Sequence, residues 1–396
     1  MWSSGPYTVA VRRLFFAVST TMFVDSLLYL AIVPLLPWYA DEFGLSKVGA
    51  AVLLASYPVA FLLTTTPAGW LAGRFGPRRV VMVGTTFFLA ATALFALAQT
   101  GDLLIVARLL QGIGGGIGWA AAMAWLTGNT APERRSRTIG AISGVLSAGA
   151  VAGPVLGAVA GATSPELAFG IAGAIALVAL GATILTPAGA TLPRDPALHR
   201  TLGQLLRHPL IICGLALALA DAAGVAAVDL LGTLALGAAG VGTTTIGIAI
   251  AAGAVLGIAA GIVAGRIGER VGSFRIALIG GIGLGVMPWI LALPLPTWMI
   301  LAVLVAIGPF FPILMTGIFP LMTSAADDLG LSHGTANALV NMVWSAGFAV
   351  VPLVVAPIAE ALGDPVAYVL SGTLVVGLLV LATVMRSRSR SLSLSH

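Results

Sequence analysis

The chain has 396 residues, of which 59% are hydrophobic and only 8% are charged. Soluble domains carry about 25% charged residues, so this composition excludes a soluble enzyme. The formal net charge of +5 comes mainly from arginines in short clusters between apolar runs, which does not indicate a nucleic-acid-binding face. The composition therefore predicts a protein of the lipid bilayer with no nucleic-acid partner.

Twelve apolar runs are long enough to cross a bilayer, which takes about 20 residues as a helix. Backbone groups in lipid must pair within the segment, so each run is expected to be α-helical. The predicted fold class is an all-α membrane protein with twelve transmembrane helices. The predicted spans are 14–38, 49–72, 80–99, 103–127, 138–161, 167–187, 210–236, 244–265, 275–293, 298–324, 334–359 and 365–385.

Basic residues alternate with the spans and predict an orientation. One side of the membrane would hold 17 of the 19 basic residues, whereas the other holds only Lys47 among several acids. The positive-inside rule then places both termini in the cytoplasm of a multi-pass plasma-membrane protein. The basic residues of the predicted inner side are Arg12, Arg13, Arg74, Arg78, Arg79, Arg134, Arg135, Arg137, Arg194, Arg200, Arg207, Arg266, Arg270, Arg275, Arg386, Arg388 and Arg390.

The longest connection, 188–209, contains prolines and charged residues and is the expected boundary between two halves. The predicted organisation is an N-terminal six-helix half (1–187), a cytoplasmic central loop (188–209), a C-terminal six-helix half (210–385) and a cytoplasmic tail (386–396).

Internal repeats support this division. The segment from Gly69 to Arg78 shares six of ten residues with the segment that begins 192 residues later, at Gly261. A second match joins Ser147 to Ser345, 198 residues apart, and Asp25 and Asp221 are separated by 196. Repeats of this kind are typical of transporters, in which two pseudo-symmetric halves enclose a site near the bilayer midplane.

Three motifs resemble those of the major facilitator superfamily (MFS). The segment Gly69-Trp-Leu-Ala-Gly-Arg-Phe-Gly-Pro-Arg78 is similar to the family's G-x-L-A-D-R-x-G-R-K loop, with Gly73 where the family usually has aspartate. Arg108-Leu-Leu-Gln111-Gly112 resembles the R-x-x-Q-G motif of span four. The resemblance implies a conformational role for Gly69, Gly73, Arg74, Gly76 and Arg78.

The third motif lies in span five and resembles the antiporter signature G-x-x-x-G-P-x-x-G-G. It comprises Gly149, Gly153, Pro154 and Gly157, with Ala158 in place of the last glycine. Small residues and a proline favour a closely packed helix that can bend. The resemblance implies that this helix takes part in the conformational change of an antiporter.

Asp25 is the principal site candidate, because an aspartate at the centre of a membrane helix costs about 3 kcal/mol even on lenient scales. Its surroundings, Asp25-Ser-Leu-Leu-Tyr29 and then Pro34-Leu-Leu-Pro37, are similar to the first span of drug:proton antiporters, particularly the vesicular amine branch. That branch has a lysine where this chain has Tyr57 and an aspartate where it has Asn341. No monoamine substrate is therefore predicted.

The remaining candidates for binding substrate or protons accompany Asp25. Tyr29 shares its helix face. Asp221 and Asp229 lie about 80° apart on span seven, so both can face one cavity, or Asp229 can line the exit. The alternative for each aspartate is a hydrogen-bonded structural carboxyl. Arg108 is a further candidate, either as a residue that couples proton movement to transport or as a counter-charge to an aspartate. Gln111 lies on the same helix face as Arg108. Asn337 and Asn341 share a face of span eleven and are the last candidates.

These features together predict a proton-coupled secondary transporter rather than an enzyme. It would export small amphipathic or cationic molecules by alternating access, in exchange for protons, and would act as a monomer in the bilayer. The alternative is an uptake symporter or facilitator for a neutral metabolite such as a sugar. A receptor or membrane enzyme has little support. No metal-ligand spacing and no ATP-binding loop is present, so neither a metal nor another cofactor is predicted.

Overall fold

The computed structural model describes residues 6–188, 207–331 and 333–393, in which all regular structure is helical. Twelve helices are long and apolar enough to span a membrane, as predicted. Most of the predicted central loop and the end of the predicted tail lie outside the described residues. The helices are α1 (Pro6–Glu42), α2 (Lys47–Phe75), α3 (Pro77–Ala96), α4 (Gly101–Gly128), α5 (Pro132–Ala162), α6 (Pro165–Leu185), α8 (Pro209–Ala227), η1 (Val228–Gly232), α9 (Thr233–Ala238), α10 (Thr243–Val271), α11 (Ser273–Leu291), α12 (Thr297–Asp328), α13 (His333–Leu362) and α14 (Asp364–Ser393).

Helix ends differ most from the predicted spans. The first helix extends from Pro6 to Glu42, beyond the predicted 14–38. Helix α14 continues through the arginine-rich segment to Ser393, whereas its predicted span ended at 385. Apolar runs mark only the part of a helix in hydrocarbon, and helices continue into the polar layers on either side.

The seventh predicted span is not a single α-helix. It consists of α8, one π-helical segment η1 and the short α9. The hydroxyl of Thr233 donates to the carbonyl oxygen of Asp229, 2.6 Å away, where η1 passes into α9. A single π-helical turn inside an α-helix is a known local irregularity of helices.

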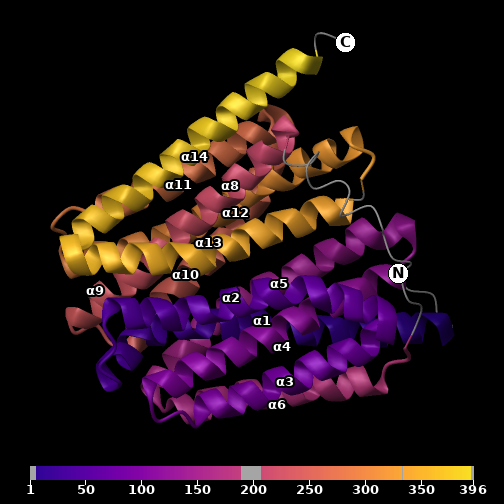
Figure 1. The fold of residues 1–396 in the computed structure, drawn as a ribbon, viewed down its shortest axis with the longest axis horizontal. Coiled ribbons are helices and arrows are strands. Elements are labelled where there is room, and N and C mark those ends of the chain that lie inside the picture. The colour runs from indigo at the N-terminus through magenta and orange to yellow at the C-terminus, as the bar shows by residue number, and fades with distance from the viewer. Residues whose placement is uncertain (1–5, 189–206, 332, 394–396) are drawn as a thin grey trace. The chain divides into compact units, whose positions relative to one another are not determined.

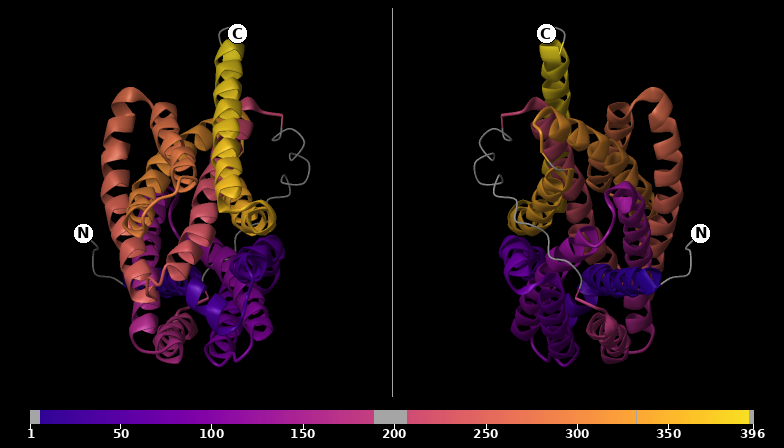
Figure 2. Two further views of the ribbon diagram at one scale, coloured as in Figure 1. Left: turned by 90° about the vertical axis from the view of Figure 1, so that its left-hand side faces the viewer. Right: turned by 90° about the vertical axis from the view of Figure 1, so that its right-hand side faces the viewer.

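The chain divides into two compact units. Unit 1 takes its residues from 1–45, 52–194 and 242–251, and unit 2 from 46–51, 195–241 and 252–396. In unit 1, drawn from indigo to magenta, α3 packs against α4 and α6, and α1 packs against α5 (Figure 1). In unit 2, α14 packs along α8 and α11 and extends past its neighbours (Figure 2).

The backbone of α2 to α4 repeats in α10 to α12 at a spacing of 196 residues. Helices α2 and α10 are both 29 residues long, and Lys47 and Phe75 correspond to Thr243 and Val271. The glycines before α3 and α11, Gly76 and Gly272, both have a positive φ, of 88° and 94°. L-residues with a side chain rarely adopt this conformation, so both turns require glycine.

The helix crossings repeat with the same spacing. A Cβ on Gly84 of α3 would lie 2.6 Å from the backbone nitrogen of Gly118 in α4. Its counterpart in unit 2, Gly280, meets the backbone of Leu314 in α12 in the same way. The sequence match between the segments that begin at Gly69 and Gly261 has a spacing of 192 residues. It is therefore displaced by four residues, about one helical turn, from the structural repeat of 196.

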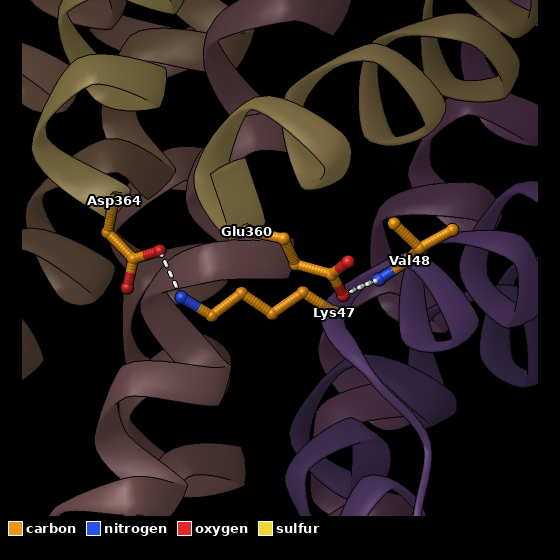
Figure 3. Close-up of polar contacts among 4 residues, drawn as sticks. All are labelled: Lys47, Val48, Glu360 and Asp364. Atoms are coloured by element: carbon orange, nitrogen blue, oxygen red, sulfur yellow. Dashed lines mark hydrogen bonds and ion pairs between the residues drawn. The ribbon is translucent and has the colours of Figure 1, made fainter. Parts of the chain in front are cut away.

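Two carboxylates of unit 2 hold the first turn of α2. Lys47 forms an ion pair with Asp364, and Glu360 accepts a hydrogen bond of 2.9 Å from the backbone nitrogen of Val48 (Figure 3). An acid at a helix N-terminus satisfies a free amide and interacts favourably with the helix dipole. Because Val52 and the later residues of α2 belong to unit 1, this helix contributes to both units.

Candidate functional site

The principal candidate, Asp25, lies buried in α1 and is bonded to one side chain. The hydroxyl of Tyr57, on α2, donates a hydrogen bond to Oδ1 of Asp25. Asp25 is 9% exposed and Tyr57 3% exposed. A buried carboxyl with a hydroxyl donor can exist with or without its proton, because the Tyr57 oxygen can also accept a hydrogen bond.

Arg108 is the buried cation of this site, and its side chain is 1% exposed. It forms no ion pair with Asp25 among the described residues. Its guanidinium carbon lies 4.8 Å from the centre of the Tyr57 ring, at cation–π distance. Its NH1 group donates to the carbonyl oxygen of Leu28 at 3.2 Å. Tyr57 therefore connects the two charges that the sequence analysis identified.

Gln111 extends the polar network to a third helix. Its Oε1 accepts a hydrogen bond of 3.2 Å from Arg108, and its Nε2 donates to the hydroxyl of Thr92 on α3 at 3.1 Å. Tyr29 lies beside Tyr57, with ring centroids 5.2 Å apart. The predicted residues Asp25, Tyr29, Arg108 and Gln111 are thus gathered in one region of unit 1.

Glycines of α4 make room for this network. A Cβ on Gly115 would lie 2.5 Å from Oδ1 of Asp25 and would also overlap the Tyr57 hydroxyl. A Cβ on Gly112 would overlap the backbone carbonyl of Tyr57. The hydrogen bond between Tyr57 and Asp25 therefore requires glycine at positions 112 and 115 of α4.

The span-five motif packs α5 directly onto α1. Cβ atoms on Gly149, Gly153 and Gly157 would lie 2.9, 2.6 and 2.7 Å from carbonyl oxygens of α1, from Phe23 to Ala31. Ser26, next to Asp25, donates a hydrogen bond of 3.1 Å to the carbonyl oxygen of Leu146 on α5. The motif thus supports the segment of α1 that carries the site.

Asp221 has a different environment in unit 2. It is fully buried in α8, and its Oδ2 accepts a hydrogen bond of 2.9 Å from Nε1 of Trp344 on α13. Its Oδ1 has no hydrogen-bond partner among the described residues. Among the described residues, no basic side chain forms an ion pair with Asp221.

The other predicted residues of unit 2 do not join Asp221 in one network. Asp229 is half-buried in η1, and its carboxylate has no hydrogen-bond or ion-pair partner among the described residues. Asn337 is half-buried, and its Oδ1 has no hydrogen-bond partner in the described part of the chain; Asn341 is exposed on α13.

The loop motif after α2 shows contacts within unit 1. Arg78 donates to the carbonyl oxygens of Thr183, at 3.2 Å, and Ile184, and so binds the C-terminal end of α6. Arg74 is exposed and lies over the ring of Trp70 at 5.4 Å. Cβ atoms on Gly69 and Gly73 would meet nothing within 4 Å.

Two aromatic residues of the site were not predicted as site residues. Tyr57 was noted only as the replacement of a lysine, and its position on span two was the available signal. Trp344 follows Asn341 by three residues on the same face of α13, which places it beside a predicted polar pair. In the described part of the chain, no cluster of three or more potential metal ligands is present.

Comparison with known proteins gives both related sequences and a related structure. The MFS-type transporter ppzB of Metarhizium rileyi is 33% identical over 144 residues, 35% of this chain and 30% of that protein. Multidrug resistance protein 1 of Bacillus subtilis is 27% identical over 167 residues, 42% of this chain and 43% of that protein. The matched segments thus span less than half the length of these relatives.

The nucleoside transporter NupG has a similar fold. Its crystal structure gives a TM-score of 0.75 at 11% identity and covers 94% of this chain and 99% of that chain. This similarity and the twelve membrane-length helices define the fold class as that of an all-α membrane protein. The Major Facilitator Superfamily model matches residues 14–352, and the chain belongs to this family.

Proposed function

We propose that the protein is a proton-coupled antiporter that exports small amphipathic or cationic molecules. The observation that carries the proposal is the buried Asp25, bonded to Tyr57 and connected through its ring to Arg108. A carboxyl in such a place binds either a proton or a cation, and each occupant excludes the other by charge. The similarity to multidrug resistance proteins of Bacillus subtilis supports this substrate class.

In the proposed cycle, alternating access exposes the substrate to one side of the membrane and then to the other. Asp25 is the residue at which proton and substrate exchange. Arg108 and Gln111 are hydrogen-bonded to each other and fix the polar network around it. Asp221 is a second proton-binding carboxyl. The protein acts as a monomer in the plasma membrane, with both termini in the cytoplasm, as the distribution of arginines indicates.

The experiment is transport of ethidium, an amphipathic cation, in proteoliposomes with an imposed pH gradient. Asp25→Asn keeps the shape of the side chain and cannot exchange a proton, so it should abolish gradient-driven transport. Asp41→Asn is the matched control, because Asp41 is an exposed residue of the same helix. Normal coupled transport by Asp25→Asn would contradict the proposal, and pH-independent counterflow of a neutral metabolite would indicate a facilitator.

A further inference from the structure

A small cavity lies beside Asp25, inside the bundle of unit 1. It offers about 20 Å³ of room for the centre of a water-sized sphere. Residues of α1, α3, α4 and α6 line it, among them Asp25, Thr21, Thr85, Gly118, Ala176 and Ala179. A buried water needs at least about 10–15 Å³ by this measure, together with two to four polar partners. The cavity is therefore large enough for one water molecule.

Thr85 supplies an unused polar group to this cavity. Its side chain is 4% exposed, and its hydroxyl has no hydrogen-bond partner among the described residues. Other buried threonines bond to their own helix: Thr92 donates to the carbonyl oxygen of Phe88 at 2.8 Å, and Thr183 to that of Ala179 at 2.8 Å. A buried hydroxyl without a partner is costly, so a ligand with hydrogen-bonding capacity is expected beside Thr85.

Asp25 offers the second partner. Tyr57 bonds to Oδ1 of Asp25, and no described residue donates a hydrogen bond to Oδ2. An ionised carboxylate has about four acceptor positions, so one donor leaves most of its capacity unused. Thr21, which also lines the cavity, already donates to the carbonyl oxygen of Ala17 at 2.9 Å but can still accept a hydrogen bond.

We propose that this cavity binds one ordered water molecule that joins the carboxyl of Asp25 to the hydroxyl of Thr85. The water donates to the carboxylate, and the Thr85 hydroxyl donates to the water. Asp25 then has two separate hydrogen-bonding sides, Tyr57 on one and the water on the other. The water keeps the ionised carboxylate solvated in an otherwise apolar wall. The presence of the water does not depend on antiport. A role of the water in the exchange of proton and substrate at Asp25 rests on the proposed function.

Small residues make the room for the water. Gly118 faces the cavity, and a Cβ added there would meet only the Cγ2 atom of Thr21, at the ordinary contact distance of 3.7 Å. Gly118→Ala should therefore fill part of the cavity without a clash with backbone. Thr85→Val removes the hydroxyl and keeps the shape of the side chain. Thr183→Val is the matched control, because the hydroxyl of Thr183 is buried and bonded to its own helix.

The test is infrared difference spectroscopy of the whole protein in lipid between low and high pH, in ordinary water and in water labelled with ¹⁸O. The carboxyl band that disappears in Asp25→Asn identifies Asp25. The wild type should show a water O–H stretch that shifts with ¹⁸O. That stretch should be lost in Thr85→Val and in Gly118→Ala, and the Asp25 band should move in both. Thr183→Val should keep both signals.

A structure of the wild type that resolves ordered waters is the second measurement, and it needs no variant to fold. Density for one water between Asp25 and Thr85 is expected. A cavity without water density would overturn the proposal. So would a Thr85→Val variant in which the isotope-sensitive stretch and the Asp25 band are both unchanged. Neither measurement requires a transported substrate, so the two proposals can fail separately. A dry cavity would leave the antiport proposal intact, and absence of proton-coupled transport would leave the proposed water site intact.

Discussion

At the scale of single residues, the site depends on an aromatic side chain placed between two buried charges. Tyr57 binds Asp25 through its hydroxyl and faces the guanidinium of Arg108 through its ring. A direct ion pair would hold the arginine and the carboxylate together strongly and hinder release of either. In the proposed exchange, the intervening tyrosine would let the carboxyl change its occupant while Arg108 keeps its bonds to Leu28 and Gln111.

Tyr57→Phe should reduce proton-driven ethidium transport by about tenfold or more, because a hydrogen bond to a charged group contributes about 1.5–3 kcal/mol. The ring and its contact with Arg108 remain. Gly115→Ala should have a similar effect with both partners retained, since the added methyl separates the Tyr57 hydroxyl from Asp25. Transport rates against pH in proteoliposomes measure both effects.

Gly181→Ala is the control for the added methyl, because a Cβ on Gly181 of α6 would meet nothing within 4 Å. Full transport by both Tyr57→Phe and Gly115→Ala would show that the hydrogen bond to Asp25 has no part in coupling.

Sequence reasoning identified the charged residues of this site more easily than the aromatic ones. Asp25 and Arg108 are conspicuous because a charge inside an apolar run is costly. Tyr57 and Trp344 resemble ordinary core residues in such runs, and only the packing of helices shows which aromatic side chain reaches a carboxyl. The cavity beside Thr85 has no signal in the sequence, since residues of four helices line it.

At the scale of helices, Arg78 closes the C-terminal end of α6. Its side chain bonds to the carbonyl oxygens of Thr183 and Ile184 in the last turn, where regular α-helical partners are missing. The carbonyl oxygen of Thr183 also accepts a hydrogen bond of 3.4 Å from the backbone nitrogen of Thr186. Its positive charge also interacts favourably with the negative end of the helix dipole. The arginine of the loop motif therefore joins the start of α3 to the end of α6.

Arg78→Met should lower the thermal stability of the protein in detergent, by about 1–3 kcal/mol in free energy, because two carbonyl oxygens lose a charged donor. Arg79→Met is the matched control, since Arg79 is the exposed neighbour. The melting temperatures of the two variants provide the comparison. Equal melting temperatures would mean that the bonds of Arg78 contribute nothing to stability.

The twelve spans were predictable because the need for about 20 apolar residues acts on each helix separately. The ends of the helices were less predictable, as α1 and α14 show. The π-helical turn η1 was not expected at all. The sequence has no mark of this turn, because threonines in regular α-helices form the same bond as Thr233, as Thr183 does.

At the scale of the whole molecule, the backbone repeats and the chemistry does not. Asp25 has its counterpart in Asp221, 196 residues later. At the same spacing, however, Tyr57 corresponds to Gly253, Arg108 to Leu304 and Gln111 to Ile307. The second aspartate thus lacks the network that surrounds the first, and Trp344 takes the place of a tyrosine donor.

The single cysteine makes the proposed orientation testable. Cys213 is fully buried, so Cys213→Ala should give a chain without thiols and with little disturbance. In that background, a membrane-impermeant maleimide applied to intact cells should label Asp41→Cys and Asp102→Cys. It should label Arg79→Cys and Arg270→Cys only after the membrane is made permeable. All four positions are exposed, and the reverse pattern would place the termini outside.

The spacing of 196 residues between α2–α4 and α10–α12 limits which sequence changes these helices can accept. One residue inserted in a helix would turn every later side chain by about 100°. The turn would move Gly84 and Gly280 away from crossings that have no room for a Cβ. Insertions are therefore confined to connections, whereas a substitution in the lining of a site leaves the frame intact. A fold built this way can change the chemistry of one site while the packing of its helices stays the same.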